Sequence, residues 1–85
     1  MKEVMIYKTS LCPYCVSAVK FLQSKGIPYQ EQSLDGDHEL RMKLSAENGG
    51  WRTVPMIFIG ERFVGGYTEL VAAHKDGRLD AWMAE

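Results

Sequence analysis

The sequence predicts an α/β fold in which helices flank a mixed four-stranded sheet. Two features lead to this prediction. In the first part of the chain, short segments rich in strand formers alternate with segments whose apolar residues have helical spacing. Later, a glycine-containing turn joins two further strand-like segments. The expected order is β-α-β-α-β-β-α, and the 85 residues are expected to form a single domain, residues 1–85.

The first strand is expected over about residues 3–7 and should be buried. After a polar loop the spacing becomes helical from Cys12 onward. Pro13 lies in the first turn, where its missing N–H leaves no helical bond unmade. Lys25-Gly26 supplies a basic last turn and a glycine cap. The apolar stripe expected to face the core consists of Val16, Val19, Phe21 and Leu22.

The second strand is expected at residues 29–34, parallel to the first because a helix connects them. Asp37 is a good N-cap for a second helix over about residues 38–47. Leu40 and Leu44 should face inward from that helix, which a glycine-rich stretch ends.

The last two strands should form an antiparallel hairpin. Residues 53–59 are the most strand-like segment of the chain, and residues 60–62 form the turn to a partner at residues 63–64. A helix over about residues 67–75 and a short helix at residues 79–83 follow.

Composition argues against several classes of partner. The formal net charge is −1, so no broad attraction to nucleic acid or to anionic membranes is expected. No apolar run approaches the roughly 18 residues of a membrane span. The N-terminus lacks the apolar core of a secretory signal. We therefore expect no nucleic-acid partner, no membrane partner and a cytoplasmic location.

Cys12 and Cys15 are the only two cysteines, and they are three positions apart. A structural disulfide normally closes a longer loop, so redox chemistry is the better interpretation. At a helix start, unpaired N–H groups and the helix dipole favour the thiolate of Cys12, the form that attacks. Cys15, one turn further in, should be more buried and should resolve a mixed disulfide on Cys12.

The cysteine pair has two other interpretations. One is an inert disulfide, which the very short loop argues against. The other is a metal site, but tetrahedral zinc needs four ligands and only His38 and His74 would remain to supply them. We therefore expect no metal held by a single chain. A cluster shared between two chains stays open, because each chain could supply one cysteine.

Thr53-Val54-Pro55 opens the strongest predicted strand. If the bond before Pro55 were cis, the Val54 backbone would turn outward and could pair with an extended, peptide-like substrate. The alternative, which this motif alone favours, is a trans proline that starts a strand.

Gly65-Gly66-Tyr67-Thr68-Glu69 is the second flanking motif. The glycines permit close backbone approach, and Thr68 is a plausible N-cap for a helix whose N-terminus would hold a carboxylate. A simple glycine turn followed by a cap is an equally good interpretation of this segment.

Taken together, Cys12-Pro13-Tyr14-Cys15, Thr53-Val54-Pro55 and the Gly65-Gly66 motif resemble a dithiol glutaredoxin of the thioredoxin superfamily. The resemblance covers essentially the whole chain. It is specific, because thioredoxins typically carry Cys-Gly-Pro-Cys. It implies a thioredoxin-like fold and a glutathione-disulfide oxidoreductase that contributes to cell redox homeostasis and electron transport.

The resemblance also implies a cis Pro55 and a set of glutathione contacts. Val54 would pair with the cysteinyl backbone, Arg52 would meet the glycyl carboxylate, and Thr68 would hold the γ-glutamyl carboxylate while Glu69 attracts the amine. Pro13, Tyr14 and Pro55 would support the cysteines. The implied glutathione-binding residues are Tyr14, Arg52, Thr53, Val54, Pro55, Gly66, Tyr67, Thr68, Glu69 and, one position before the lysine of many family members, Lys8.

The expected activity is reduction of protein disulfides and glutathione mixed disulfides. Glutathione would be a co-substrate, with no permanently bound cofactor, and the protein partners would be disulfide-containing or glutathionylated proteins acted on by a monomer. Two alternatives remain. One is a redoxin served by thioredoxin reductase. The other is an iron–sulfur carrier or sensor bridged by Cys12 of two chains.

Overall fold

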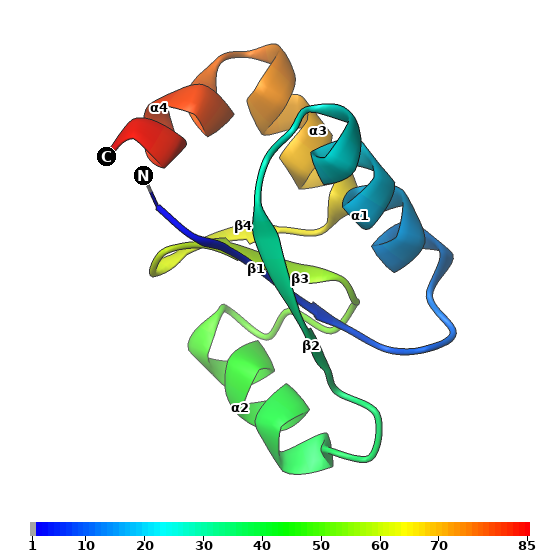
Figure 1. The fold of residues 1–85 in the computed structure, drawn as a ribbon. Coiled ribbons are helices and arrows are strands. Elements are labelled where there is room, and N and C mark those ends of the chain that lie inside the picture. The colour runs from blue at the N-terminus through cyan, green and yellow to red at the C-terminus, as the bar shows by residue number, and fades with distance from the viewer. Residues whose placement is uncertain (1) are drawn as a thin grey trace.

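A computed structural model of the protein describes residues 2–85. Its core is a mixed four-stranded sheet in the order β2-β1-β3-β4, with helices on both faces (Figure 1). The elements, in chain order, are β1 (Val4–Lys8), α1 (Pro13–Ser24), β2 (Tyr29–Ser33), α2 (His38–Glu47), β3 (Met56–Ile59), β4 (Arg62–Gly65), α3 (Tyr67–Lys75) and α4 (Arg78–Ala84).

The strand pairing confirms the predicted topology. β1 runs parallel to β2, from Val4 opposite Tyr29 to Lys8 opposite Ser33. β1 is antiparallel to β3, and β3 is antiparallel to β4 across a tight turn at Gly60-Glu61. The central position of β1 matters for function, because the cysteine loop follows directly from its end.

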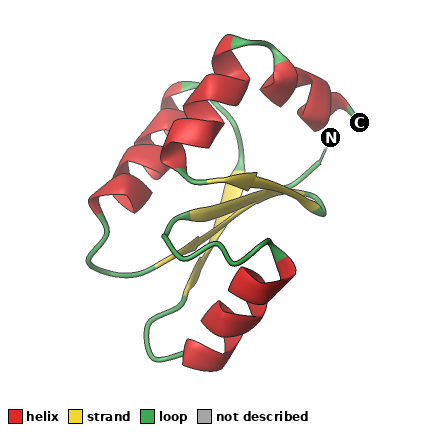
Figure 2. Cartoon of the chain, turned by 180° about the vertical axis from the view of Figure 1, so that it is seen from behind, coloured by secondary structure: helices red, strands yellow, loops and turns green. Residues whose placement is uncertain are grey.

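Each face of the sheet has its own apolar core. The helices α1, α3 and α4 cover one face and α2 covers the other (Figure 2). Strand side chains alternate between the two faces, so Val4 and Ile6 pack under α1 while the neighbouring Tyr7 packs toward α2. The first core is built on Val4, Ile6, Ala18, Leu22, Ile57, Ile59, Leu70, Ala73, Leu79 and Met83, and the second on Leu34, Leu44 and Met56.

The Asp37 signal at the start of α2 and the glycine signal at the end of α1 are confirmed, but the basic last turn expected in α1 is not, because Lys25 is the C-cap and the last turn holds no basic residue. Asp37 caps α2, because its Oδ1 accepts the Leu40 N–H at 3.1 Å. Lys25 is the C-cap of α1, and the next residue, Gly26, has φ +67°, a value that glycine adopts without strain.

Two predictions of detail were wrong. Val16 does not face the core and is 53% exposed. The buried face of α1 follows Cys15, Ala18 and Leu22, at i, i+3 and i+7, and Val16 lies one residue off that face.

Strand β3 begins at Met56 and not at residue 53, because pairing with β1 starts where Met56 lies opposite Tyr7. The preceding Pro55 has no N–H to donate to the sheet.

None of the helices within residues 2–85 has the length and apolar character of a bilayer span, and the longest of them, α1, has 12 residues.

The buried face of α1 predicts unequal effects for two substitutions. Leu22→Ala should lower the free energy of unfolding by about 2–5 kcal/mol, because it removes a fully buried side chain and leaves a cavity. Val16→Ala, on the exposed side of the same helix, should change it by less than about 0.5 kcal/mol. Urea denaturation followed by far-UV circular dichroism measures both. A Val16→Ala cost equal to that of Leu22→Ala would contradict the assignment of the buried face.

Candidate active site

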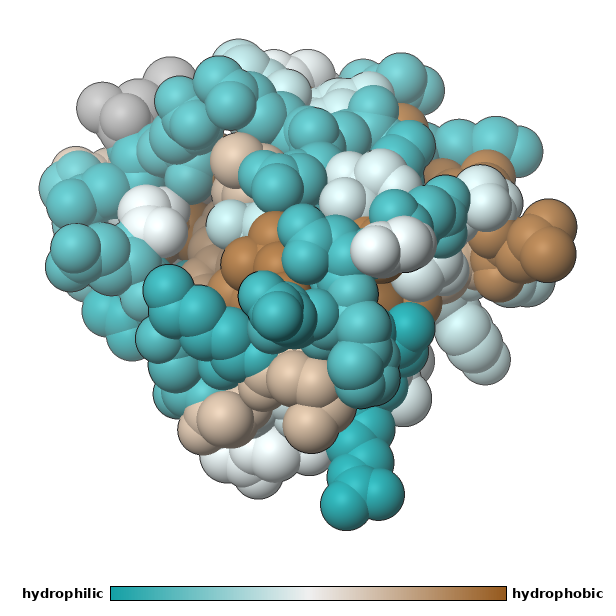
Figure 3. Space-filling view, turned by 90° about the horizontal axis from the view of Figure 1, so that it is seen from below, coloured by the Kyte–Doolittle hydropathy of each residue, from teal (hydrophilic) through white to brown (hydrophobic). Residues whose placement is uncertain are grey.

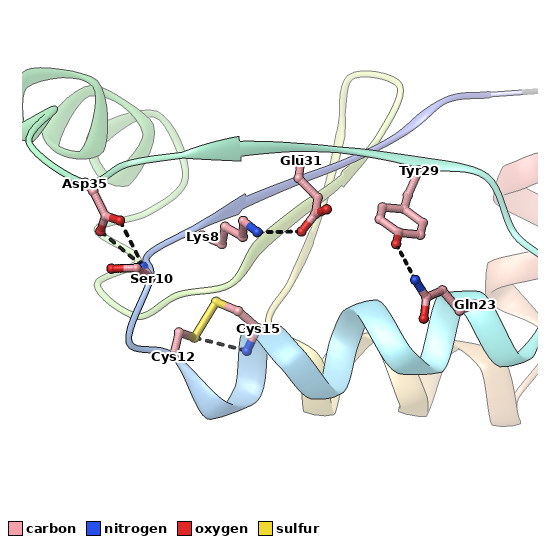
Figure 4. Close-up of polar contacts among 8 residues, drawn as sticks. All are labelled: Lys8, Ser10, Cys12, Cys15, Gln23, Tyr29, Glu31 and Asp35. Atoms are coloured by element: carbon pink, nitrogen blue, oxygen red, sulfur yellow. Dashed lines mark hydrogen bonds and ion pairs between the residues drawn. A yellow bond between two sulfur atoms is a disulfide. The ribbon is translucent and has the colours of Figure 1, made fainter.

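Cys12 is the N-cap of α1. Its backbone is extended, with φ −140° and ψ 98°, and Pro13 takes the first helical position. The backbone N–H of Cys15 donates to Cys12 Sγ at 3.0 Å. The two cysteines form a disulfide whose Cα atoms lie 5.2 Å apart (Figure 4). The cysteine sulfur therefore caps the helix, a position in which Ser, Thr or Asp is more usual.

This geometry makes the two sulfurs unequal. In the reduced protein the Cys15 N–H and the helix dipole both favour negative charge on Cys12 Sγ. Cys12 is also slightly the more exposed, at 7% against 2% for Cys15. The division between an attacking Cys12 and a resolving Cys15 stays a prediction.

A groove of about 380 Å³ lies on the α3 side of the disulfide. It combines the predicted motifs from three separate parts of the chain: the start of α1, the loop before β3 and the start of α3. The Val54–Pro55 bond is cis, as the resemblance implied. The Val54 carbonyl oxygen lies 3.6 Å from Cys12 Sγ. The groove is lined by Tyr14, Trp51, Thr53, Val54, Pro55, Gly66, Tyr67, Thr68 and Glu69.

The start of α3 differs from the prediction. Gly66, and not Thr68, is the N-cap. The reason is Glu69, whose Oε1 accepts the Gly66 N–H at 2.8 Å and whose Oε2 accepts the Thr68 hydroxyl at 3.0 Å. The turn needs glycine at position 65, whereas the nearest atom to a Cβ on Gly66 is the flexible end of the Glu69 side chain. A Cβ on Gly65, where φ is +120°, would lie 2.9 Å from Glu69 Cγ, and one on Gly66 would lie 3.1 Å from Glu69 Oε1.

Two predicted glutathione contacts lie outside the lining of this groove. Arg52 lines a neighbouring hollow of about 490 Å³ with Arg41 and His38. The Arg52 carbonyl oxygen accepts a hydrogen bond from the Arg41 guanidinium at 3.0 Å. Lys8 forms an ion pair with Glu31, with 2.7 Å between Nζ and Oε1. The role of either residue toward glutathione stays a prediction.

Lys8 and Glu31 line a second cavity, of about 300 Å³, on the β2 side of the disulfide. Cys12 and Cys15 contribute to its wall, as do Val16, Val19 and Lys20 from α1. Glu31 was not among the predicted site residues. Strand alternation could have found it, because Lys8 continues the series of Val4 and Ile6, and Glu31 that of Tyr29. Trp51 of the groove was also missed, and only its position beside Arg52 pointed to it.

Asp35 ties the loop before Cys12 to the loop after β2. Its two carboxylate oxygens accept the Ser10 N–H at 3.2 and 3.1 Å (Figure 4). This backbone hydrogen bond, helped by the Ser10 and Ser33 side chains and by the charge of Lys8, holds the pKa of Asp35 below its ordinary value. The charged form of Asp35 is therefore the one that fixes the cysteine loop.

Within residues 2–85, no three or more His, Cys, Asp or Glu side chains cluster in a way that could hold a metal ion.

Comparison with known proteins places the site in a family context. A model of the glutaredoxin family matches residues 4–64. A curated glutaredoxin of Pseudomonas aeruginosa is 48% identical over 84 residues, which cover 99% of each chain. Glutaredoxin 3 of Escherichia coli is 40% identical over 80 residues, or 94% of this chain and 95% of that protein.

Solved structures are similar in fold. The crystal structure of a buckwheat glutaredoxin–glutathione complex has a TM-score of 0.85 at 28% identity, covering 95% of this chain and 76% of that one. The solution structure of a glutaredoxin from Brucella melitensis has a TM-score of 0.83 at 37% identity, covering 100% and 94%.

The Asp35–Ser10 contact predicts a pH-dependent loss of stability. Because the pKa of Asp35 is lowered by folding, its contribution is present above the ordinary carboxyl pKa and is lost as the pH falls through the folded value. Asp35→Asn should therefore be less stable than wild type at pH 7, and the difference should disappear in acid. Urea denaturation from pH 7 to pH 2 measures it, with the exposed hairpin residue Glu61→Gln as the matched control. A difference that stayed constant with pH would rule out the charge as its cause.

Proposed function

The chain belongs to the glutaredoxin family, and we propose that it is a glutathione-dependent oxidoreductase that reduces protein disulfides and glutathione mixed disulfides. The observation that carries this proposal is the disulfide at the N-terminus of α1, beside a groove built from the Thr53-Val54-Pro55 loop and the start of α3. Glutathione is the co-substrate, and no permanently bound cofactor takes part.

The first step is attack by the Cys12 thiolate on a sulfur of the substrate disulfide. A bond forms between Cys12 Sγ and that sulfur, the substrate S–S bond breaks, and the other sulfur leaves as a thiolate that takes a proton from water. The Cys15 N–H, 3.0 Å from Cys12 Sγ, stabilises the attacking charge.

The second step depends on the substrate. With a glutathionylated protein, Cys12 carries glutathione, and a second glutathione thiolate attacks it and releases oxidised glutathione. With a protein disulfide, Cys15 attacks the mixed disulfide on Cys12 and the reduced protein leaves. Two glutathione molecules then reduce the Cys12–Cys15 disulfide, so that each cycle transfers two electrons.

The groove suits a short anionic peptide. Val54 presents its backbone next to Cys12, where the cysteinyl residue of glutathione would lie. The N-terminus of α3 offers N–H groups to a carboxylate, with the Thr68 hydroxyl nearby. Each Glu69 oxygen accepts one hydrogen bond and keeps capacity for the γ-glutamyl amine. The buckwheat glutaredoxin of similar fold was solved as a glutathione complex, which supports the same ligand here.

The surface around the cysteines suits a protein substrate. The face seen in Figure 3 is largely hydrophilic, with hydrophobic residues showing near its centre and at its right edge. Among residues 2–85, four large apolar side chains are exposed: Leu11, Tyr14, Val16 and Met42. Three of the four lie within the segment from residue 11 to residue 16, next to the reactive sulfurs, where a partner's apolar residues can contact them.

The division of roles between the sulfurs predicts unequal cysteine variants. Cys12→Ser should abolish reduction of a glutathione mixed disulfide, because the attacking thiolate is gone. Cys15→Ser should retain part of that activity and lose reduction of a protein disulfide, because only the second reaction needs a resolving thiol. Turnover coupled to NADPH consumption measures both reactions. Equal loss in the two variants on the mixed disulfide would contradict the assigned roles.

The proposed co-substrate predicts the reductant. Wild-type protein with a disulfide substrate should turn over with NADPH, glutathione reductase and glutathione, and should not do so with NADPH and thioredoxin reductase alone. The same substrate serves in both arms, and each arm has a reaction without the protein as its control. Turnover with thioredoxin reductase but not with glutathione would refute glutathione dependence while leaving the oxidoreductase chemistry intact.

A further inference from the structure

The Lys8–Glu31 pair lies in the second cavity, apart from the groove proposed for glutathione. Lys8 ends β1 and Glu31 lies in β2, and both side chains point into the space between the sheet and α1 (Figure 4). Their ion pair, at 2.7 Å, faces a cavity of about 300 Å³ whose wall includes both cysteines. Opposite charges therefore lie in a cavity beside the disulfide that shares no lining residue with the groove proposed for glutathione.

The two sulfurs differ in what surrounds them. Cys12 Sγ is held by the Cys15 N–H and lies 3.6 Å from the carbonyl oxygen of Val54, a residue of the groove. Figure 4 shows the Cys15 sulfur on the side of the disulfide toward Lys8. The Cys15 sulfur is therefore on the side of the disulfide that the ion pair faces.

Few other charges face this cavity. Lys20, on α1, is exposed at its edge. Asp35 is engaged by the Ser10 N–H. Glu69 lies on the groove side, bonded to Gly66 and Thr68. Gln23, at the far end, donates to the Tyr29 hydroxyl at 2.9 Å and carries no charge.

We propose that Lys8 and Glu31 are positioning residues that act with opposite sign on the Cys15 thiol. The Lys8 ammonium favours the Cys15 thiolate, and the Glu31 carboxylate both disfavours it and holds Lys8 in the ion pair. The resolving thiol is thus kept protonated more than Lys8 alone would allow. That this affects turnover rests on the proposed function, in which Cys15 resolves the mixed disulfide.

The step under control is the second attack. The Cys15 S–H gives its proton to water in the cavity, and the resulting thiolate forms a bond to Cys12 Sγ. The bond between Cys12 and the substrate sulfur breaks, and the substrate leaves with the electron pair as a thiolate. The two cysteines are oxidised and the substrate is reduced. Because the Glu31 carboxylate offsets the charge of Lys8, less Cys15 thiolate is present and this step is slower. Glutathione then has more time to reach the mixed disulfide.

The backbone fixes the pair independently of any ligand. Strand alternation turns Lys8 and Glu31 toward α1, as it turns Ile6 and Tyr29. The parallel register places Glu31 opposite Ile6. Ile6 is two residues before Lys8 in β1, so its side chain is on the same face of the sheet as that of Lys8. Both side chains are about one-third exposed, at 36% and 33%, so the effect should be sensitive to salt.

The test is the titration of Cys15 in a Cys12→Ser background, where only one thiol remains. Thiolate formation is followed by ultraviolet absorbance against pH at low salt. Adding Glu31→Gln should lower the midpoint and Lys8→Gln should raise it, each by about half a unit or more. The double variant should return close to its parent, Lys8→Arg should leave the midpoint unchanged, and both shifts should shrink in about 1 M salt.

Glu85→Gln is the matched control. Glu85 pairs with Arg62 at 3.4 Å, at the C-terminus, so this variant makes the same charge change away from the cysteines and should leave the midpoint unchanged. Shifts of the same sign in Glu31→Gln and Lys8→Gln, or no shift in either, would overturn the proposal. Because no glutathione is present in the titration, its outcome is independent of the reductant assay.

Discussion

The hydrogen bond from the Cys15 N–H to Cys12 Sγ is the contact on which the site depends. It exists because α1 begins at Pro13, which leaves the preceding Cys12 extended and its sulfur turned back over the first helical turn. A serine at this position would cap the helix equally well but would be a far weaker nucleophile. Structure and reactivity thus share one interaction, since the group that satisfies an open N–H of the helix is also the group that attacks.

The sheet brings the remaining parts to this sulfur. β1 lies at the centre and ends at the cysteine loop, so features on both sides of it converge there. Toward β3 and α3, the Val54 backbone and the Gly66 turn form the groove. Toward β2, Lys8 and Glu31 form the opposite wall. Both cysteines line the β2-side cavity, and Cys12 Sγ also lies 3.6 Å from the Val54 carbonyl oxygen of the groove, so the two sulfurs have different surroundings although they are three residues apart.

Much of the fold could be predicted from the sequence because its signals are local. The Asp37 cap, the Lys25-Gly26 helix end and the Gly60 hairpin are each set by a few adjacent residues, and they fix the order of elements. The errors arose where a position depends on neighbours elsewhere. Val16 has the composition of a core residue, yet the burial of Cys15 and Ala18 sets a helix phase that exposes it. Thr68 has a side chain suited to an N-cap, but the Glu69 side chain accepts the Gly66 N–H, and Gly66 is the N-cap of α3.

The candidate site shows the same division. The cysteines and the three groove motifs could be predicted because they are consecutive residues with distinct chemistry. Strand alternation can place Lys8 and Glu31 on one face of the sheet, but the register that brings them together is not specified by the sequence pattern. Likewise, the hydrogen bond from the Arg41 guanidinium to the Arg52 carbonyl oxygen depends on where α2 packs. Sequence patterns locate the reactive atoms, whereas the charges around them follow from tertiary packing.

The central claim is that the N-terminus of α1 makes Cys12 the thiolate of the pair. The most direct measurement is the alkylation rate of each cysteine in reduced wild-type protein, as a function of pH, with the modified residue identified by mass spectrometry. Cys12 should react first, with a midpoint well below the ordinary thiol value of about 8.5, while Cys15 stays protected. Equal rates for the two cysteines, or earlier alkylation of Cys15, would contradict it.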